Sequence, residues 1–507
     1  MSFLPIVQRE LRVSSRRKAT YYVRAAAAML GMVIGFFLLL MTMLPGSAGA
    51  SFGLHMLTVL SWYALLMAML AGVFLASDCL SEERREGTLG LLFLTDLKGY
   101  DVVLGKFMAV SLNAFYGLLA FFPVLALTLL VGGVTAGAFW RTSLALFNLL
   151  FFSVAAGMLV SSFCRSSYRA MTGSIALLLT ALAVSCIATM ANLRYVSEFS
   201  PFGSFLMASD SEYFRLAGAY WTSLCVSHLM GWIFLGLASW RMRTFVDKAK
   251  TSGVWQRLFT RNLLGGSAVR RVRLLEVNPV LWLLDDSRRL RWVAWLLSLG
   301  GVLLLIYVWC EGGTTGLSFS RFYIWPFYFL LKMFIAIQAC RFFGEARRTG
   351  ALELLCCTPL TMRAVIQGQW MLLRRVLLWP LIVLLLAHLT GLVLAYMRGS
   401  GMFGIPKGNM PGMFDFTIAY QQFIVIPNNV ADYFALGWFG MWLALSLQRP
   451  NIAAGLTILC VLVLPTIIWC VPTLATDAIF IIVGWVKLTD DFRLIQAQWA
   501  TQKPAAS

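Results

Sequence analysis

The chain has 507 residues, of which 60% are hydrophobic and 12% are charged, and its formal net charge is +19. So little polar surface excludes a soluble globule of this length and indicates an all-α polytopic membrane protein. Basic loops beside membrane ends bind anionic headgroups and set orientation, so the positive charge does not require nucleic acid. We therefore expect membrane lipid as a partner and no nucleic acid.

Apolar runs along the chain predict how often it crosses the bilayer. A hydrocarbon core about 30 Å thick needs about 20 mostly apolar residues per helix. On this scale the sequence predicts about twelve spans, grouped as two six-helix repeats: a first half at 1–240, a basic cytoplasmic linker at 241–278 and a second half at 279–507. The predicted spans cover residues 25–44, 54–77, 107–131, 142–163, 170–191, 220–240, 292–310, 322–343, 376–396, 430–447, 452–471 and 473–488.

The distribution of basic residues predicts the orientation. With the N-terminus in the cytoplasm, 34 of the 41 Lys and Arg residues fall on cytoplasmic segments, as the positive-inside rule requires. The C-terminus is then cytoplasmic too. The basic, then apolar, N-terminal stretch imitates a signal peptide, but its apolar run is longer than the usual signal core of about 7–15 residues. We interpret it as a retained first span.

Segments beside the first span of each half suit helices lying along the membrane surface. Residues 5–12 mix apolar and charged side chains, as interfacial helices do. In the second half, Asn278 and Pro279 offer an N-cap followed by a proline at the first helical position. An ordinary basic flank is an equally good explanation for the first copy.

The predicted external loops differ between the halves. In the first half, residues 192–218 form a loop that carries Ser200-Pro201-Phe202. In the second half, a segment rich in Gly, Pro and Met at 398–429 lies one hairpin earlier. The outer surface is therefore expected to be asymmetric.

The sequence contains no nucleotide-binding motif. The nearest imitation, from Gly99 to Phe107, has five residues between its glycines instead of four, and Phe107 stands where a Ser or Thr would bind magnesium. The ten cysteines lack metal-ligand spacing and suit apolar packing. We therefore expect no catalytic residue, no metal and no cofactor bound by this chain.

Ion-coupled transporters need ionisable groups at membrane depth. All 22 Asp and Glu residues fall at predicted span ends or in loops. The ionisable candidates within spans are Lys332, His228 and His388, which we treat as possible substrate-path residues. A Lys that bonds backbone carbonyls between helices, and histidines that serve in packing, are the competing interpretations.

A charged segment after the second span of each half is repeated. Residues 82–106 and 345–369 are identical at eleven of 25 aligned positions, which indicates duplication. Recurring leucines predict a short amphipathic cytoplasmic helix, and Gly87 and Gly350 would permit a tight bend before it. A charge cluster that only sets topology is the simpler alternative, but it would not require Gly, Leu and Thr at fixed offsets.

At these residues the chain resembles the permease of type-2 ABC (ATP-binding cassette) exporters. The family segment reads approximately E-x-x-x-G-T-L-x-x-L-L-x-T-P-L with a following G-K. The first copy matches at Glu83, at 87–89 and at 105–106, but has Asp96 for the proline. The second copy keeps Pro359 but has Ala351 for Thr and Gln369 for Lys.

The resemblance implies a non-catalytic permease subunit with both halves fused in one chain. Two copies of a separate ABC ATPase, which binds ATP and magnesium, would drive substrate movement across a bacterial plasma (inner) membrane. An ion-coupled secondary transporter and a membrane scaffold or assembly protein are the alternatives, and the substrate stays open. The implied ATPase-coupling residues are Glu82, Glu83, Arg84, Arg85, Gly87, Thr88 and Leu89 in the first copy, and Glu345, Arg347, Arg348, Gly350 and Leu352 in the second.

Overall fold

The computed structural model describes eleven segments of the chain and some isolated N-terminal positions. These segments are 51–86, 98–164, 167–190, 198–249, 278–280, 287–311, 313–352, 362–397, 413–447, 450–467 and 473–490. The isolated positions lie between 7 and 36 and at 196, so most of the predicted span at 25–44 falls outside the described residues. Within the described ranges the regular structure is entirely helical, which confirms an all-α protein.

The chain forms two compact units, residues 1–253 and 254–507. Helix α13 of the first unit continues to Ala249, so nine residues of the predicted linker at 241–278 are helical. The finer division into 1–240, 241–278 and 279–507 stays a prediction.

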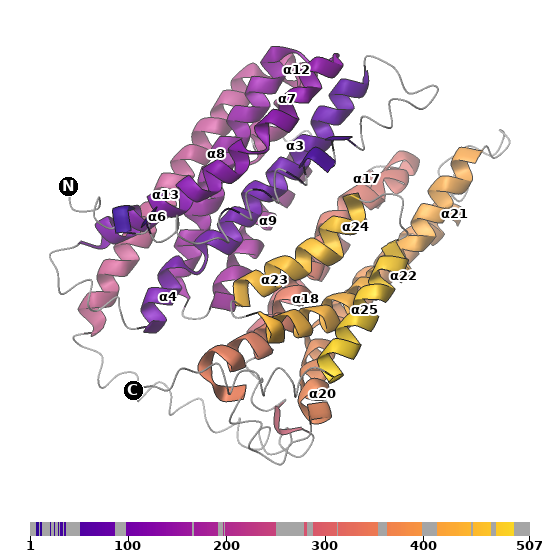
Figure 1. Cartoon of the computed structure of the whole chain (residues 1–507). Helices are drawn as coiled ribbons and strands as arrows, with labels where there is room; N and C mark the ends of the chain where they lie inside the picture. Colours follow the sequence, from indigo (N-terminus) through magenta and orange to yellow (C-terminus); the bar gives the residue numbers. More distant parts are fainter. Residues whose placement is uncertain are drawn as a thin grey trace. The chain divides into compact units, whose positions relative to one another are not determined.

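The first unit is a bundle of long helices, drawn in indigo to magenta in Figure 1. Helix α8 lies at its centre and packs against both α3 and α13. The elements are α3 (Ser51–Ala71), the π-helix η1 (Gly72–Ala76), α4 (Cys79–Glu86), α6 (Gly99–Leu119), α7 (Phe122–Val131), α8 (Ala136–Phe163), α9 (Ser167–Met190), α11 (Gly203–Leu206), α12 (Asp210–Arg215) and α13 (Ala217–Ala249).

Small residues let α8 approach the α3–η1 helix closely. A Cβ on Gly157 would collide with the backbone of Gly72, and one on Gly72 would collide with the backbone of Ser153. The Ser153 hydroxyl donates a 2.6 Å hydrogen bond to the carbonyl of Ala68. Close backbone approach and interhelical hydrogen bonds are the usual means of helix association in a bilayer. Burial of apolar side chains gives little driving force there, because the lipid tails are apolar as well.

The predicted external loop at 192–218 is more ordered than its composition indicates, because it contains α11 and α12. Asp210 at the start of α12 forms an ion pair with Arg141 of α8. The Arg141 guanidinium also lies 4.1 Å from the ring centre of Tyr213. Phe202 is 1% exposed, packed in the bundle. This end of the unit is therefore fixed by side-chain contacts.

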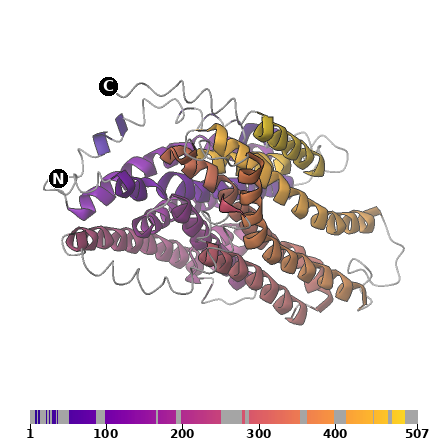
Figure 2. The same ribbon diagram turned by 90° about the horizontal axis from the view of Figure 1, so that it is seen from below.

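The second unit contains ten helical elements in its described part. Figure 2 shows the unit from below, in salmon pink through orange to yellow. Helix α22 packs most extensively against α25 and α18. The elements are α17 (Ser287–Glu311), α18 (Gly313–Thr349), α20 (Met362–Leu373), the π-helix η2 (Arg374–Leu378), α21 (Trp379–Met397), α22 (Met413–Ser446), α23 (Pro450–Ile458), the π-helix η3 (Leu459–Val463), α24 (Leu464–Ile467) and α25 (Thr473–Asp490).

The prediction of an external segment at 398–429 is wrong from Met413 onward, because α22 begins there. The apolar run at 416–426 continues the helix, and Pro427 lies inside it. A proline removes one backbone donor and does not always end a helix in a membrane protein, where neighbouring groups satisfy the freed carbonyl. Asp432 consequently lies within a 34-residue helix and not at the start of one.

Six helical stretches in the described part are long and apolar enough to cross a membrane. Two shorter apolar helices occur at 291–303 and 452–463. The chain is thus a multi-pass membrane protein by length and composition, while the predicted count of twelve spans stays a prediction. The six stretches are Met56–Ser81, Gly99–Val131, Ala136–Phe163, Ala217–Met242, Phe327–Arg347 and Arg363–Thr390.

Candidate functional site

The first copy of the repeated segment is held by an ion pair between α4 and α6. The Lys106 ammonium lies 2.7 Å from a carboxylate oxygen of Glu83 and donates a second bond of 3.2 Å to the carbonyl of Cys79. The two charged side chains are only 11% and 13% exposed. A pair this poorly hydrated is costly to break, because either partner alone would leave a buried charge.

Hydrogen bonds also fix the beginning of α4 to the core helix α8. A π-helix and a turn precede α4, so its first backbone N–H groups lack partners within the helix. The Ser161 hydroxyl of α8 accepts bonds from the N–H groups of Leu80 and Ser81, at 3.1 and 3.0 Å. The carboxylate of Asp78 accepts from the hydroxyls of Ser81 and Ser167, both at 2.7 Å. A displacement of α4 would therefore be passed directly to α8 and α9.

Helix α6 begins with its own cap. The Asp101 side chain accepts a 3.0 Å hydrogen bond from the backbone N–H of Lys98. The false nucleotide motif from Gly99 to Phe107 thus lies on helix α6 and not in a phosphate-binding loop. Glu82, Arg84 and Arg85 lie on α4, while Gly87, Thr88 and Leu89 fall outside the described residues.

In the second copy, α18 ends at Thr349 and Gly350 follows with a φ of 72°. Only glycine adopts this left-handed conformation without steric cost, and it is the common way to end a helix. The predicted bend at Gly350 is therefore present. Leu352, two residues later, is 6% exposed, so the chain turns back onto the unit.

The charged residues before the bend contact their own unit. The Arg347 guanidinium donates a 2.8 Å hydrogen bond to the carbonyl of Leu445 near the end of α22. Glu345 lies 3.8 Å from Arg341, one turn earlier on α18. Arg348 lies on α18 as well. In this copy, therefore, Arg347 ties the end of α18 to α22.

The ion pair of the first copy has no charged counterpart in the second. In the alignment, Glu83 corresponds to Ala346 and Lys106 corresponds to Gln369, so both charges are missing together. Gln369 is fully buried and donates a 2.9 Å hydrogen bond to the carbonyl of Gln338 on α18. A neutral side-chain contact thus joins α20 to α18 where a charged one joins α6 to α4.

The predicted cap at Asn278 is present. Its side-chain oxygen accepts a 2.8 Å hydrogen bond from the N–H of Val280, and its amide donates one of 2.9 Å to the carbonyl of Ala364 on α20. A Cβ on Gly368 would lie 2.8 Å from the Cβ of Val280. The glycine that recurs as Gly105 and Gly368 therefore allows the segment at 278–280 to lie directly on α20.

The predicted substrate-path residues each have contacts within their own unit. Lys332 of α18 forms an ion pair of 2.5 Å with Asp432 of α22. His228 of α13 is hydrogen-bonded to Asn148 at 3.0 Å and accepts from the indole N–H of Trp232 at 3.1 Å. Because its Nε2 accepts, its Nδ1 is the donor to Asn148, which is the pattern of a neutral packing histidine.

His388 of α21 is 2% exposed and lies edge-on to the ring of Tyr328.

The carboxylates beside Lys332 are what the sequence pattern misses. Asp432 and Asp477, both assigned to span ends from the sequence, are 8% and 1% exposed. The sequence signal of Asp432 is a carboxylate inside an apolar run, which the misplaced start of α22 conceals, whereas Asp477 lies near the start of α25 as predicted.

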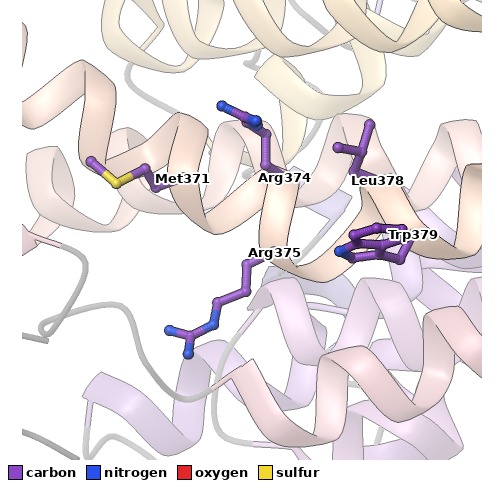
Figure 3. A pocket seen from close by; sticks show the side chains of 5 residues that line it. All are labelled: Met371, Arg374, Arg375, Leu378 and Trp379. Atoms are coloured by element: carbon purple, nitrogen blue, oxygen red, sulfur yellow. The ribbon is translucent and has the colours of Figure 1, made fainter. Parts of the chain in front are cut away.

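A shallow surface depression of about 290 Å³ surrounds the π-helix η2. Figure 3 shows its two arginines, Arg374 and Arg375, projecting from the helix in different directions. Met371, Leu378 and Trp379 complete its lining. Among the residues that the structure describes, no group of three or more His, Cys, Asp or Glu side chains is placed to hold a metal ion.

Comparison with known proteins finds a family match in the first unit. The family model described as ABC-2 family transporter protein matches residues 57–244. This range contains the whole first copy of the repeated segment and helices α4, α6 and α8, which hold it. No curated protein matches the sequence. Residues 57–244 are therefore similar to the ABC-2 type permease family, and this similarity supports a membrane component of an ABC transporter.

Proposed function

We propose that this chain is the permease subunit of an ABC exporter and that it couples ATP hydrolysis on a separate ATPase to movement of a substrate. The observation that carries this proposal is the fixation of the first repeated segment. Glu83 and Lys106 join α4 to α6, and Ser161 joins α4 to the core helix α8. Because α4 is attached rigidly to α6 and α8, a displacement of α4 from the cytoplasmic side would move these membrane helices as well.

The docking surface on the ATPase side consists of the charged edge of α4 and the residues that follow it. Glu82, Arg84 and Arg85 belong to this edge, and Arg348 near the end of α18 is the counterpart of Arg85 in the second copy. Each copy would engage one ATPase, so the proposal includes two ATPase copies that bind ATP and magnesium. Because the two copies are held by different contacts, we expect them to transmit movements of the ATPase to the membrane helices unequally.

Helix packing supports two related six-helix halves. In the first unit α8 packs against α3 and α13, and in the second α22 packs against α18 and α25. These are the predicted second, fourth and sixth spans of each half. The same neighbours in the same chain order are expected of a duplicated fold. We infer twelve spans with both termini in the cytoplasm of a bacterial cell.

Site-specific photocrosslinking in native membranes tests the docking surface. A photoreactive amino acid replaces Arg85 on α4 in the full-length chain, and a matched variant carries it at Glu212 on the opposite, predicted external end. We expect an ATP-binding-cassette protein to be captured at Arg85 and not at Glu212. Capture of no ATPase at Arg85, with the chain inserted normally, would contradict the proposal.

Stimulated ATP turnover separates the permease from a membrane scaffold. A scaffold would bind the ATPase but would not change the rate at which the ATPase hydrolyses ATP. For a permease, we expect the chain reconstituted in liposomes to alter ATP hydrolysis by the captured ATPase. Unchanged hydrolysis would favour the scaffold.

A further inference from the structure

The second unit contains a buried cluster of three ionisable side chains that the coupling mechanism does not use. Lys332 comes from α18, Asp432 from α22 and Asp477 from α25. The Lys332 ammonium lies 2.5 Å from a carboxylate oxygen of Asp432, and these side chains are 18% and 11% exposed. Asp477 is 1% exposed and interacts electrostatically with both.

The charges in this cluster do not balance. One ammonium and two carboxylates leave one negative charge, and the ion pair assigns Lys332 to Asp432. The Oδ2 atom of Asp477 is buried and has no hydrogen-bond partner among the residues that the structure describes. An ionised carboxylate in that position would lose its hydration without gaining a partner, which is strongly unfavourable. A proton on Asp477 removes the excess charge.

The surroundings of Asp477 offer no second cation in the described part of the chain. Asp432 and Lys332 are the charged groups that face it from α22 and α18. Other titratable side chains on the neighbouring elements include Tyr433 on α22, Cys460 on η3 and Tyr328 on α18, and Arg374 of η2 interacts electrostatically with Tyr433. On α25 itself, Lys487 is ten residues away along the helix. Among the described residues, Lys332 is the cation that interacts with Asp477.

Neighbouring polar groups suit the movement of a proton. Asn429 lies three residues before Asp432, hence on the same face of α22, and is 4% exposed. Its side-chain oxygen, like that of Asn428, accepts no hydrogen bond within the described ranges. Such oxygens can accept bonds from water molecules that deliver a proton. The cluster therefore has buried acceptors as well as a titratable group.

We propose that Asp477 is a proton-binding residue and that the second unit takes up and releases one proton there. When the proton leaves to water, the carboxylate of Asp477 competes with that of Asp432 for the Lys332 ammonium. Because the three side chains come from α18, α22 and α25, this competition changes the forces between those helices. The state of the unit is thereby linked to pH, independently of whether an ATPase binds.

Infrared difference spectroscopy of the purified full chain in lipid nanodiscs at neutral pH tests the assignment. A protonated carboxylic acid has a C=O stretch that a carboxylate lacks. We expect Asp477→Asn to remove one such band from the wild-type spectrum. Asp101→Asn is the matched control, because Asp101 is also buried but accepts a hydrogen bond from the Lys98 N–H, and it should leave the band in place.

Two further variants test the protonation of Asp477 if the Asp477→Asn protein is poorly stable. Asp432→Asn frees Lys332 to pair with Asp477, so we expect the band to disappear although Asp477 is still present. Lys332→Met removes the cation that pairs with Asp432, so we expect an additional band. An unchanged band in Asp477→Asn would overturn the proposal. Thermal stabilisation of the wild type by sodium but not by choline, lost in Asp477→Asn, would also overturn it in favour of a metal cation.

Discussion

The two copies of the repeated segment perform the same structural task by different chemistry. In the first, the buried Glu83–Lys106 ion pair joins the helix after the second span to α6. In the second, Ala346 and Gln369 occupy these positions, and Gln369 donates to the backbone of α18. The loss of both charges together leaves no uncompensated ion. A duplicated segment can thus change its internal contacts while it keeps its recurring glycines and leucines.

The largest loss of stability is expected when the Glu83–Lys106 ion pair of the first copy loses one of its charges. Glu83→Gln leaves Lys106 buried without its carboxylate, and we expect the free energy of unfolding to fall by about 3–5 kcal/mol. The double variant Glu83→Ala/Lys106→Gln reproduces the neutral pair of the second copy. Because it strands no charge, we expect it to lose less than Glu83→Gln. Thermal unfolding in detergent measures both variants, and a larger loss in the double variant than in Glu83→Gln would show that the two residues do not act as a pair.

The close contact at the recurring glycine gives a second test. Gly368→Ala places a Cβ 2.8 Å from that of Val280 and 2.9 Å from the side-chain oxygen of Asn278. We expect a loss of about 1–3 kcal/mol, as for other overpacked sites. The control is Gly117→Ala on α6, where a Cβ has no neighbour within 4 Å. The same unfolding measurement should show no loss for the control, and equal effects of the two substitutions would refute the packing of residues 278–280 on α20.

The smallest expected effect on stability is at the bend after α18. Gly350→Ala puts a side chain on a residue with a φ of 72°, which costs about 1–2 kcal/mol. A Cβ there meets no atom within 4 Å, so strain is the only cause. Gly350→Asn should be better tolerated, because asparagine enters the left-handed region more readily. Equal unfolding temperatures for both variants and the wild type would show that the bend is not needed.

Much of this architecture follows from local patterns in the sequence. The composition predicts a helical membrane protein, and the recurrence of Gly87 as Gly350 predicts the bend that the structure contains at the second position. Asn278 is recognisable as a cap because capping depends on neighbouring residues alone. Such features are predictable because their causes lie within a few residues of one another.

Features that depend on distant pairing are not predictable in this way. Glu83 and Lys106 are 23 residues apart, and their contact depends on the path of the chain between α4 and α6. Asp432 is misassigned to a span end because the start of α22 at Met413 is hidden by a segment rich in Gly, Pro and Met. Since Asp432 lies well inside α22, a lack of carboxylates within spans no longer counts against an ion-coupled mechanism.

Unequal docking of an ATPase by the two repeated segments can be measured in liposomes. ATP hydrolysis by the captured ATPase is compared for the wild-type chain, for Arg85→Glu and for the aligned substitution Arg348→Glu. Both substitutions reverse one charge, so they are matched. We expect Arg85→Glu to reduce the stimulated turnover about tenfold, equivalent to about 1.4 kcal/mol of interaction, and Arg348→Glu to reduce it less. Turnover unchanged by either substitution, or reduced equally by both, would contradict the account.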